Sequence, residues 1–193
     1  MSKCLIIKML ILMWTHQSLD MNEQDRKNAI DQTELIYDYS IQNNFDPFAV
    51  YAIVYHESRF RNLQDLNTVS CGAFQVAHAY VPKTCDELKT FRVSLEVAFD
   101  HHLLGYMQKY KYTFQEKNIF EKDYKSKSAL LNIFRLYASG PNCENPKDEC
   151  YLDANKKAKD RLITRNRLHR IFLENYKDYS VNFHLLDGKK CTK

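Results

Sequence analysis

The chain has 193 residues, of which 45% are hydrophobic, so it is long enough for one compact domain with a sizeable core. Its formal net charge of +4 is too small to favour a nucleic-acid partner. Only 4 Gly and 4 Pro are present, which leaves little material for the tight turns of a β-rich fold. The composition therefore favours a mainly α-helical domain.

Residues 1–19 have the pattern of a short signal peptide or N-terminal apolar segment. Lys3 precedes an apolar run that ends at Trp14, and polar residues follow up to Ser18. The run is too short for a membrane span, and Lys8 interrupts it. We expect export into the periplasm or the medium, with cleavage near Ser18. An amphipathic helix of a cytosolic protein is the alternative.

The chain contains six cysteines, which are Cys4, Cys71, Cys85, Cys143, Cys150 and Cys191. Cys71 and Cys85 flank one short segment. Cys143 and Cys150 flank a loop with a proline, so two local disulfides fit the spacing, although spacing alone leaves the connectivity open. Disulfides would agree with export, and Cys4 would leave with the leader. No C-x-x-C pair indicates a zinc site, and free buried thiols in a reducing compartment are the alternative.

Hydrophobic periodicity predicts helices over residues 22–44, 47–59, 86–111, 128–137 and 151–176. Asp46 is a good N-cap and Pro47 suits a first helical position, so these two residues mark a helix start. Gly140 and Pro141 predict a helix end. Residues 72–80 fit either a short strand or a helical turn. We expect one domain over residues 20–180 and a loosely held tail over 181–193.

Glu57 is notable because it continues the apolar stripe of its predicted helix. The stripe comprises Val50, Ile53 and Val54, and helical spacing places Glu57 next on the same face. A carboxylate on an inner face is costly unless it is paired or protonated. A carboxyl kept protonated at neutral pH could serve as an acid. Periodicity alone equally allows that the helix is ending and that Glu57 is leaving the core.

Other patterns carry weaker evidence for a site. His56-Glu57 begins like the zinc-binding H-E-x-x-H helix, but Phe60 occupies the position of the second histidine. His101 and His102 are adjacent, so on a helix they would point in different directions and could not share a metal. The last predicted helix carries a basic run, which we expect to form a solvated face; a binding site for an anionic polymer is the alternative. The run consists of Lys156, Lys157, Lys159, Arg161, Arg165, Arg167 and Arg170.

Four segments, in order, resemble the signatures of soluble lytic transglycosylases, the bacterial and phage enzymes that cleave peptidoglycan. The run from Asp46 to Phe60, DPFAVYAIVYHESRF, is similar to the first signature, whose glutamate is catalytic. Ser70 to Val76, SCGAFQV, resembles the second. Tyr137 to Pro141, YASGP, resembles the third, and Glu149-Cys150-Tyr151 resembles the fourth. The third segment has Ala138 where the family usually has Asn, which removes an amide expected to orient groups in the cleft.

The resemblance implies a mainly α, compact lysozyme-like domain with a glycan groove and at most a minimal β element. It implies that Glu57 is the single general acid/base that cleaves the MurNAc-GlcNAc β-1,4 bond and forms 1,6-anhydro-MurNAc. Substrate-binding roles are implied for Ser58, Ser70, Gly72, Gln75, Tyr137 and Tyr151. We expect no cofactor and no metal. The expected partners are peptidoglycan glycan strands, not nucleic acid, and the expected state is a monomer.

Two alternatives fit the same residues. A hydrolase of the goose-type lysozyme kind would need a second carboxylate to position water, and Asp65 is the nearest candidate. A non-catalytic peptidoglycan-binding assembly factor would be a degenerate relative, and Ala138 is the feature that keeps this interpretation open. By analogy with small transglycosylases that carry a leader, the protein would serve a secretion or conjugation apparatus or a phage particle.

Overall fold

The computed structural model describes residues 3–15, 19–65, 70–121, 127–140, 143 and 145–182. These residues form a mainly α-helical fold with one small sheet, which confirms the predicted fold class. The α-helices are α1 (Lys3–Thr15), α2 (Glu23–Gln42), α3 (Pro47–Ser58), α4 (Cys85–Leu88), α5 (Phe91–Ala98), α6 (Leu104–Lys109), α7 (Lys127–Ser139) and α8 (Glu149–Asn182). The short elements are the 3-10 helices η1 (His78–Tyr80) and η3 (Glu116–Phe120) and the π-helical η2 (Phe99–Leu103).

The sheet is antiparallel and has the order β1-β2-β3. Its strands are β1 (Gln64–Asp65), β2 (Ser70–Cys71) and β3 (Val76–Ala77). Ser70 is the register partner of both Asp65 and Ala77, so β2 is the central strand. Residues 72–80, which the sequence left open, contain both a strand and a helical turn.

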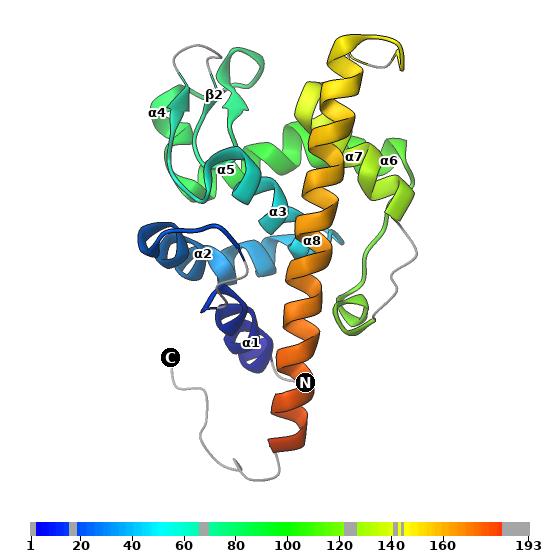
Figure 1. The fold of residues 1–193 in the computed structure, drawn as a ribbon. Helices are drawn as coiled ribbons and strands as arrows, with labels where there is room; N and C mark the ends of the chain where they lie inside the picture. The colour runs from blue at the N-terminus through cyan, green and yellow to red at the C-terminus, as the bar shows by residue number, and fades with distance from the viewer. Residues whose placement is uncertain are drawn as a thin grey trace.

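The long helix α8 is the axis around which the other elements gather (Figure 1). It packs against α7, α3 and α1, and α2 lies against α1 and α3. In this view the sheet and α4 lie on one side of α8 and α6 on the other. Segments from both halves of the chain therefore meet along one helix.

Helix α3 forms the centre of the core, because its residues from Pro47 to Val54 are all buried. The Asp46 side chain caps the N-terminus and accepts a 2.8 Å hydrogen bond from the Phe48 backbone nitrogen, as predicted. The left-handed backbone of Arg59, with φ 54°, ends the helix. Glu57 therefore lies in the last turn, where the buried helix reaches the surface of the core.

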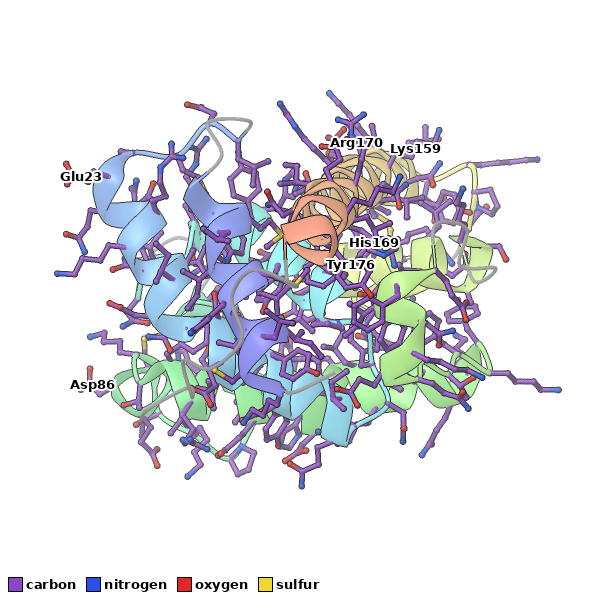
Figure 2. The ribbon with its side chains drawn as sticks, turned by 90° about the horizontal axis from the view of Figure 1, so that it is seen from below. Glu23, Asp86, Lys159, His169, Arg170 and Tyr176 are labelled. Carbon is purple, nitrogen blue, oxygen red and sulfur yellow. A yellow bond between two sulfur atoms is a disulfide. The ribbon has the colours of Figure 1, made fainter. Side chains whose placement is uncertain are left out.

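The expectation of a solvated basic face on α8 is wrong for two residues. Arg161 and Arg165 are only 3% and 5% exposed. Arg165 pairs with Asp46 at 2.6 Å, and Arg161 pairs with Glu57. Lys159, in contrast, points away from the body of the protein in Figure 2. The sequence shows where charge occurs along a helix but not which charges meet partners on another helix.

The helix predicted over residues 86–111 is interrupted twice. Thr84 and Glu87 form a capping box that starts the single turn α4, and the chain bends after Leu88 before α5 begins. Between α5 and α6 the backbone is the π-helix η2, a form that is rare and often found at functional sites. The apolar periodicity continues through both interruptions, which is why the sequence alone predicts one helix.

The predicted helix end at Gly140 is confirmed, since this residue has φ 73° and its nitrogen donates a 2.7 Å hydrogen bond to the Leu136 carbonyl. Pro141 lies outside the described residues, as does most of the tail predicted over residues 181–193. Disulfides join Cys71 to Cys85 and Cys143 to Cys150, so the two local pairings that fit the spacing are confirmed.

Helix α1 packs into the core rather than beside it. Trp14 is 1% exposed, and its ring meets Tyr51 and Phe60 edge-on with centroid distances of 5.3 and 5.0 Å. Its Nε1 donates a 2.9 Å hydrogen bond to Thr33 Oγ1. Cys4, also in α1, is disulfide-bonded. Cleavage of residues 1–19 stays a prediction.

Because Trp14 is buried on α3, the substitution Trp14→Ala in the full chain should lower the free energy of unfolding by about 3–5 kcal/mol. Urea denaturation followed by circular dichroism measures this change. Ile163→Ala is the control, since Ile163 is 65% exposed and its loss should change stability by no more than about 0.5 kcal/mol. Equal stability of the two variants would show that α1 is not part of the cooperatively folded core.

Candidate active site

A cleft of about 950 Å³ lies where α3 ends. Its walls come from α3, α7, α8, the sheet, η2 and α6. The lining residues are His56, Glu57, Ser70, Gln75, Val76, Ala77, Tyr80, His101, His102, Tyr106, Leu136, Tyr137, Ala138, Ser139, Gly140, Lys157, Asp160 and Arg161. Among these described residues the carboxylates are Glu57 and Asp160, and they differ in setting because Asp160 is exposed.

Glu57 lies against Arg161 of α8. The Arg161 Nη2 donates to Glu57 Oε1, and the two side chains are 4% and 18% exposed. Arg161 Nε and Nη1 are buried and have no hydrogen-bond partner within the described part of the chain. One turn further along α8, Thr164 Oγ1 lies 2.8 Å from His56 Nε2 and fixes the neighbouring residue of α3. The C-terminal turn of α3 is thus held to α8 by two polar contacts.

Opposing influences act on the pKa of Glu57. Burial raises this pKa above the ordinary carboxyl value, while Arg161 and, more weakly, Lys157 lower it. The net shift is upward, which is the direction that a general acid requires. Partial desolvation and the Arg161 charge lower the pKa of His56, and burial lowers that of His102, so both imidazoles are neutral at pH 7. The positive charge near Glu57 therefore comes from Arg161 and Lys157.

The turn over residues 72–75 forms the wall that faces Glu57's helix. Ser58 Oγ donates a 2.7 Å hydrogen bond to the Ala73 carbonyl. Tyr137 Oη donates a 2.9 Å hydrogen bond to the Phe74 carbonyl. These bonds tie the turn to the end of α3 and to α7. Glu57 and the turn therefore keep a fixed relation to each other.

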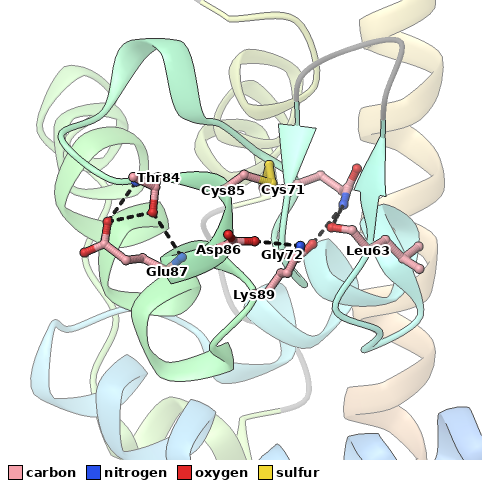
Figure 3. Close-up of a disulfide and its surroundings, with 9 residues drawn as sticks. Leu63, Cys71, Gly72, Thr84, Cys85, Asp86, Glu87 and Lys89 are labelled. Atoms are coloured by element: carbon pink, nitrogen blue, oxygen red, sulfur yellow. Dashed lines mark hydrogen bonds and ion pairs between the residues drawn. A yellow bond between two sulfur atoms is a disulfide. The ribbon is translucent and has the colours of Figure 1, made fainter.

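Gly72 occupies a position in this turn that only glycine fits. Its φ is 77°, and a Cβ at this site would lie 2.0 Å from the Leu88 carbonyl oxygen. Its nitrogen donates a 2.7 Å hydrogen bond to the Leu63 carbonyl, and the Cys71–Cys85 disulfide beside it joins the turn to α4 (Figure 3). The close packing against α4 is thus built into the sequence of the turn.

Gln75 completes the turn in an unusual backbone conformation. Its φ is 49°, in the left-handed region that residues other than glycine rarely adopt. Its Nε2 donates a 2.8 Å hydrogen bond to the Gly72 carbonyl, which closes the turn on itself. Backbone strain of this kind persists where the surroundings impose it and is common at functional sites.

The residues predicted for the site fall into three groups. Those that line the cleft are Glu57, Ser70, Gln75 and Tyr137. Ser58 and Gly72 lie behind the wall and hold the turn. Tyr151 is not among the residues that line the cleft, and the Arg135 guanidinium lies 4.4 Å from its ring centroid, so its implied role in substrate binding stays a prediction. Asp65, the predicted second carboxylate, has a side chain outside the described part of the structure.

Sequence reasoning missed Arg161, Asp160 and the cleft position of the histidines. Arg161 and Asp160 belong to a basic and acidic stretch that has the usual composition of a solvated helix. His101 and His102 line the cleft from the π-helix η2. No signal in the sequence marks that irregular segment.

The four family-like segments are not supported by a wider match. No family model matches the chain, and no curated protein or solved structure matches it. Within the described residues, no three His, Cys, Asp or Glu side chains gather closely enough to hold a metal ion. The functional argument therefore depends on the geometry of the cleft.

We expect Gly72→Ala to destabilise the protein by about 3 kcal/mol, because the new Cβ would overlap the Leu88 carbonyl and the backbone has a positive φ. Gly105→Ala is the matched control: Gly105 is in α6, and a Cβ there meets nothing within 4 Å. It should stabilise the protein by about 0.5–1 kcal/mol. Urea denaturation of both variants tests the prediction, and a neutral Gly72→Ala would contradict it.

The raised pKa of Glu57 predicts how stability depends on pH. The stabilising contribution of protonated Glu57 is complete below its unfolded pKa of about 4.5 and is lost as the pH rises through the folded pKa. The stability of the wild type relative to Glu57→Gln should therefore fall over this range, by about 1.4 kcal/mol for each unit of pKa difference. Denaturation curves at several pH values measure it. A relative stability that rises with pH would mean that Arg161 outweighs burial.

Proposed function

We propose that the protein is a peptidoglycan lytic transglycosylase with Glu57 as its single general acid/base. The observation that carries this proposal is the position of Glu57, a largely buried carboxyl with a raised pKa at the wall of a large cleft. Three of the four family-like segments converge there: the first supplies Glu57, the second the 72–75 turn, and the third the end of α7. Three of the four segments that follow one another in the sequence therefore also lie close together in space.

The chemistry requires one group that first gives and then takes a proton. Protonated Glu57 would donate its proton to the oxygen of the β-1,4 bond as the bond breaks and positive charge develops at the muramic C1. The resulting carboxylate would accept the proton of the muramic C6 hydroxyl while its oxygen bonds to C1. The product is a 1,6-anhydro sugar, and no water is consumed.

The cleft offers suitable contacts for the sugars. Ser70 and Gln75 present polar groups on the sheet side of the cleft. Tyr80 lies at the cleft and is 84% exposed, so its ring face is open for stacking on a sugar. Tyr137 already donates its hydroxyl proton to the Phe74 carbonyl, so its role is to hold the turn and to shield Glu57.

Two alternatives have a specific observation in their favour. Asp160 lines the cleft and could position water in a hydrolase, which would give a reducing-end muramic acid instead of the anhydro sugar. Ala138 lines the cleft where the family usually has Asn, which favours a non-catalytic peptidoglycan-binding factor. Such a factor would bind sacculi and release nothing from them, with Glu57→Gln indistinguishable from the wild type.

We propose that the protein acts outside the cytosol, in the periplasm or the cell wall. The two disulfides are compatible with an oxidising compartment. In the described residues, the helices are all too short or too polar to cross a bilayer. Service to a secretion, conjugation or phage machine is proposed by analogy only.

The decisive experiment is mass spectrometry of muropeptides released from purified sacculi. The wild type should release 1,6-anhydro muropeptides, and Glu57→Gln should slow release by about 10²–10⁴-fold, because it removes the proton donor. Asp160→Asn should retain the activity of the wild type. Reducing-end products from the wild type, together with inactivity of Asp160→Asn, would establish a hydrolase instead.

A further inference from the structure

The ion pair at the cleft presents a difficulty for an enzyme whose acid must be protonated. Arg161 binds Glu57 through a single nitrogen, and this contact favours the carboxylate form of Glu57. A carboxylate held in this way cannot donate a proton to a glycosidic oxygen. Something must therefore weaken the hold of Arg161 on Glu57 before the first step.

The Arg161 guanidinium has N–H donors at the cleft that are not used in hydrogen bonds within the described part of the chain. A guanidinium has five N–H donors in a planar fork that suits two parallel hydrogen bonds to a carboxylate. In the described part of the chain, Arg161 Nε and Nη1 have no hydrogen-bond partner. The Arg161 side chain lines the cleft and is only 4% exposed. Buried donors without partners are costly, so a ligand that supplies acceptors would be favoured.

Lys157 adds a second positive charge to the same wall. It lies one turn before Arg161 on α8 and lines the cleft. Its side chain is 54% exposed and pairs with Asp153 at 2.8 Å. An anion that enters the cleft would therefore meet Lys157 at the rim and Arg161 below it. The other titratable side chains that line the cleft are those of His56, His101, His102, Tyr80, Tyr106, Tyr137 and Asp160. Burial lowers the pKa of His56 and His102, and Asp160 is exposed.

We propose that a carboxylate of the glycan substrate takes over Arg161 from Glu57, and that Glu57 then accepts a proton from solvent and becomes the acid. This inference rests on the proposed function and specifies its substrate class: glycans that carry a carboxylate, such as a muramic lactyl or peptide-stem group. A neutral glycan of the same length would occupy the cleft but would leave the contact between Arg161 and Glu57 in place. The two kinds of glycan would therefore differ more in their rate of turnover than in their affinity for the cleft.

Nuclear magnetic resonance of the Glu57 side-chain carboxyl tests the inference without any cleavage. The resonance is assigned by its absence in Glu57→Gln, and its pH titration is recorded for the free protein, with N-acetylmuramyl dipeptide and with neutral chitotriose. Muramyl dipeptide has no bond between two sugars, so it cannot be cleaved during the titration. Chitotriose lacks the lactyl ether and therefore the carboxylate that is tested. We expect the titration midpoint to rise by about one unit or more with muramyl dipeptide and to stay unchanged with chitotriose.

Variants of α8 provide the controls. In Arg161→Met the midpoint should already be high in the free protein and should not respond to muramyl dipeptide. Arg161→Lys keeps a positive charge and the fold, and it should show a reduced response. Arg170→Met is the matched surface control, because Arg170 points away from the body of the protein in Figure 2, and it should respond as the wild type does.

Either of two results with muramyl dipeptide would overturn the inference: an unchanged midpoint when it is bound, or an absence of binding at any soluble concentration. A shift seen equally with chitotriose would also exclude the carboxylate as its cause. These results are independent of the sacculus assay. Release of anhydro muropeptides without a midpoint shift would leave the proposed function intact, whereas a shift without release would leave the anion site intact.

Discussion

The crossing of α3 over α8 is fixed by a buried ion pair on which the site depends. Asp46 is fully buried, caps α3 through the Phe48 nitrogen and pairs with Arg165 at 2.6 Å. Arg165 Nη1 donates to His169 Nδ1 at 3.2 Å, and His169 Nε2 donates to the Ile119 carbonyl at 2.7 Å, which assigns a neutral imidazole with its proton on Nε2. Loss of one partner from such a buried pair typically costs about 3–5 kcal/mol.

The two ion pairs between α3 and α8 differ in a way that separates structure from function. The Asp46 carboxylate has hydrogen-bond partners on both oxygens and lies away from solvent. The Glu57 carboxylate has one partner among the described residues, Arg161, and its side chain retains 18% exposure and faces a cleft. The first pair is a closed network that sets the crossing. The second is held in place by that crossing but remains open to a ligand, as expected for a group that takes part in chemistry.

The parts of the structure that follow from local interactions could be predicted from the sequence. Asp46 and Pro47 mark the start of α3 because capping and proline geometry involve neighbouring residues only. The position of Gly140 predicts the end of α7 for the same reason. Arg161 could not be predicted as the partner of Glu57, since the two residues lie far apart in the chain and a basic run gives no direction.

Several polar groups that the resemblance assigns to substrate binding are used within the protein. The Ser58 and Tyr137 hydroxyls hold carbonyls of the 72–75 turn, and the Gln75 amide holds that of Gly72. These bonds hold the turn, and in the proposed mechanism a fixed wall would keep the lone acid at a constant distance from the bond to be cleaved. The residues of a motif can therefore serve catalysis by building the cleft without touching the sugar.

A mechanism with one carboxyl, as proposed for Glu57, places a demand on the acidity of that carboxyl. Burial alone would make Glu57 a weak acid that holds its proton too firmly, and Arg161 alone would make it a carboxylate that never acquires one. The pKa that serves both proton donation and proton acceptance lies near the working pH. At Glu57 burial is the larger influence and raises the pKa, while Arg161 limits the rise, so the pKa is sensitive to any third charge. Under the proposed mechanism, the pairing of Glu57 with Arg161 would therefore act as an adjustable balance rather than as a structural salt bridge.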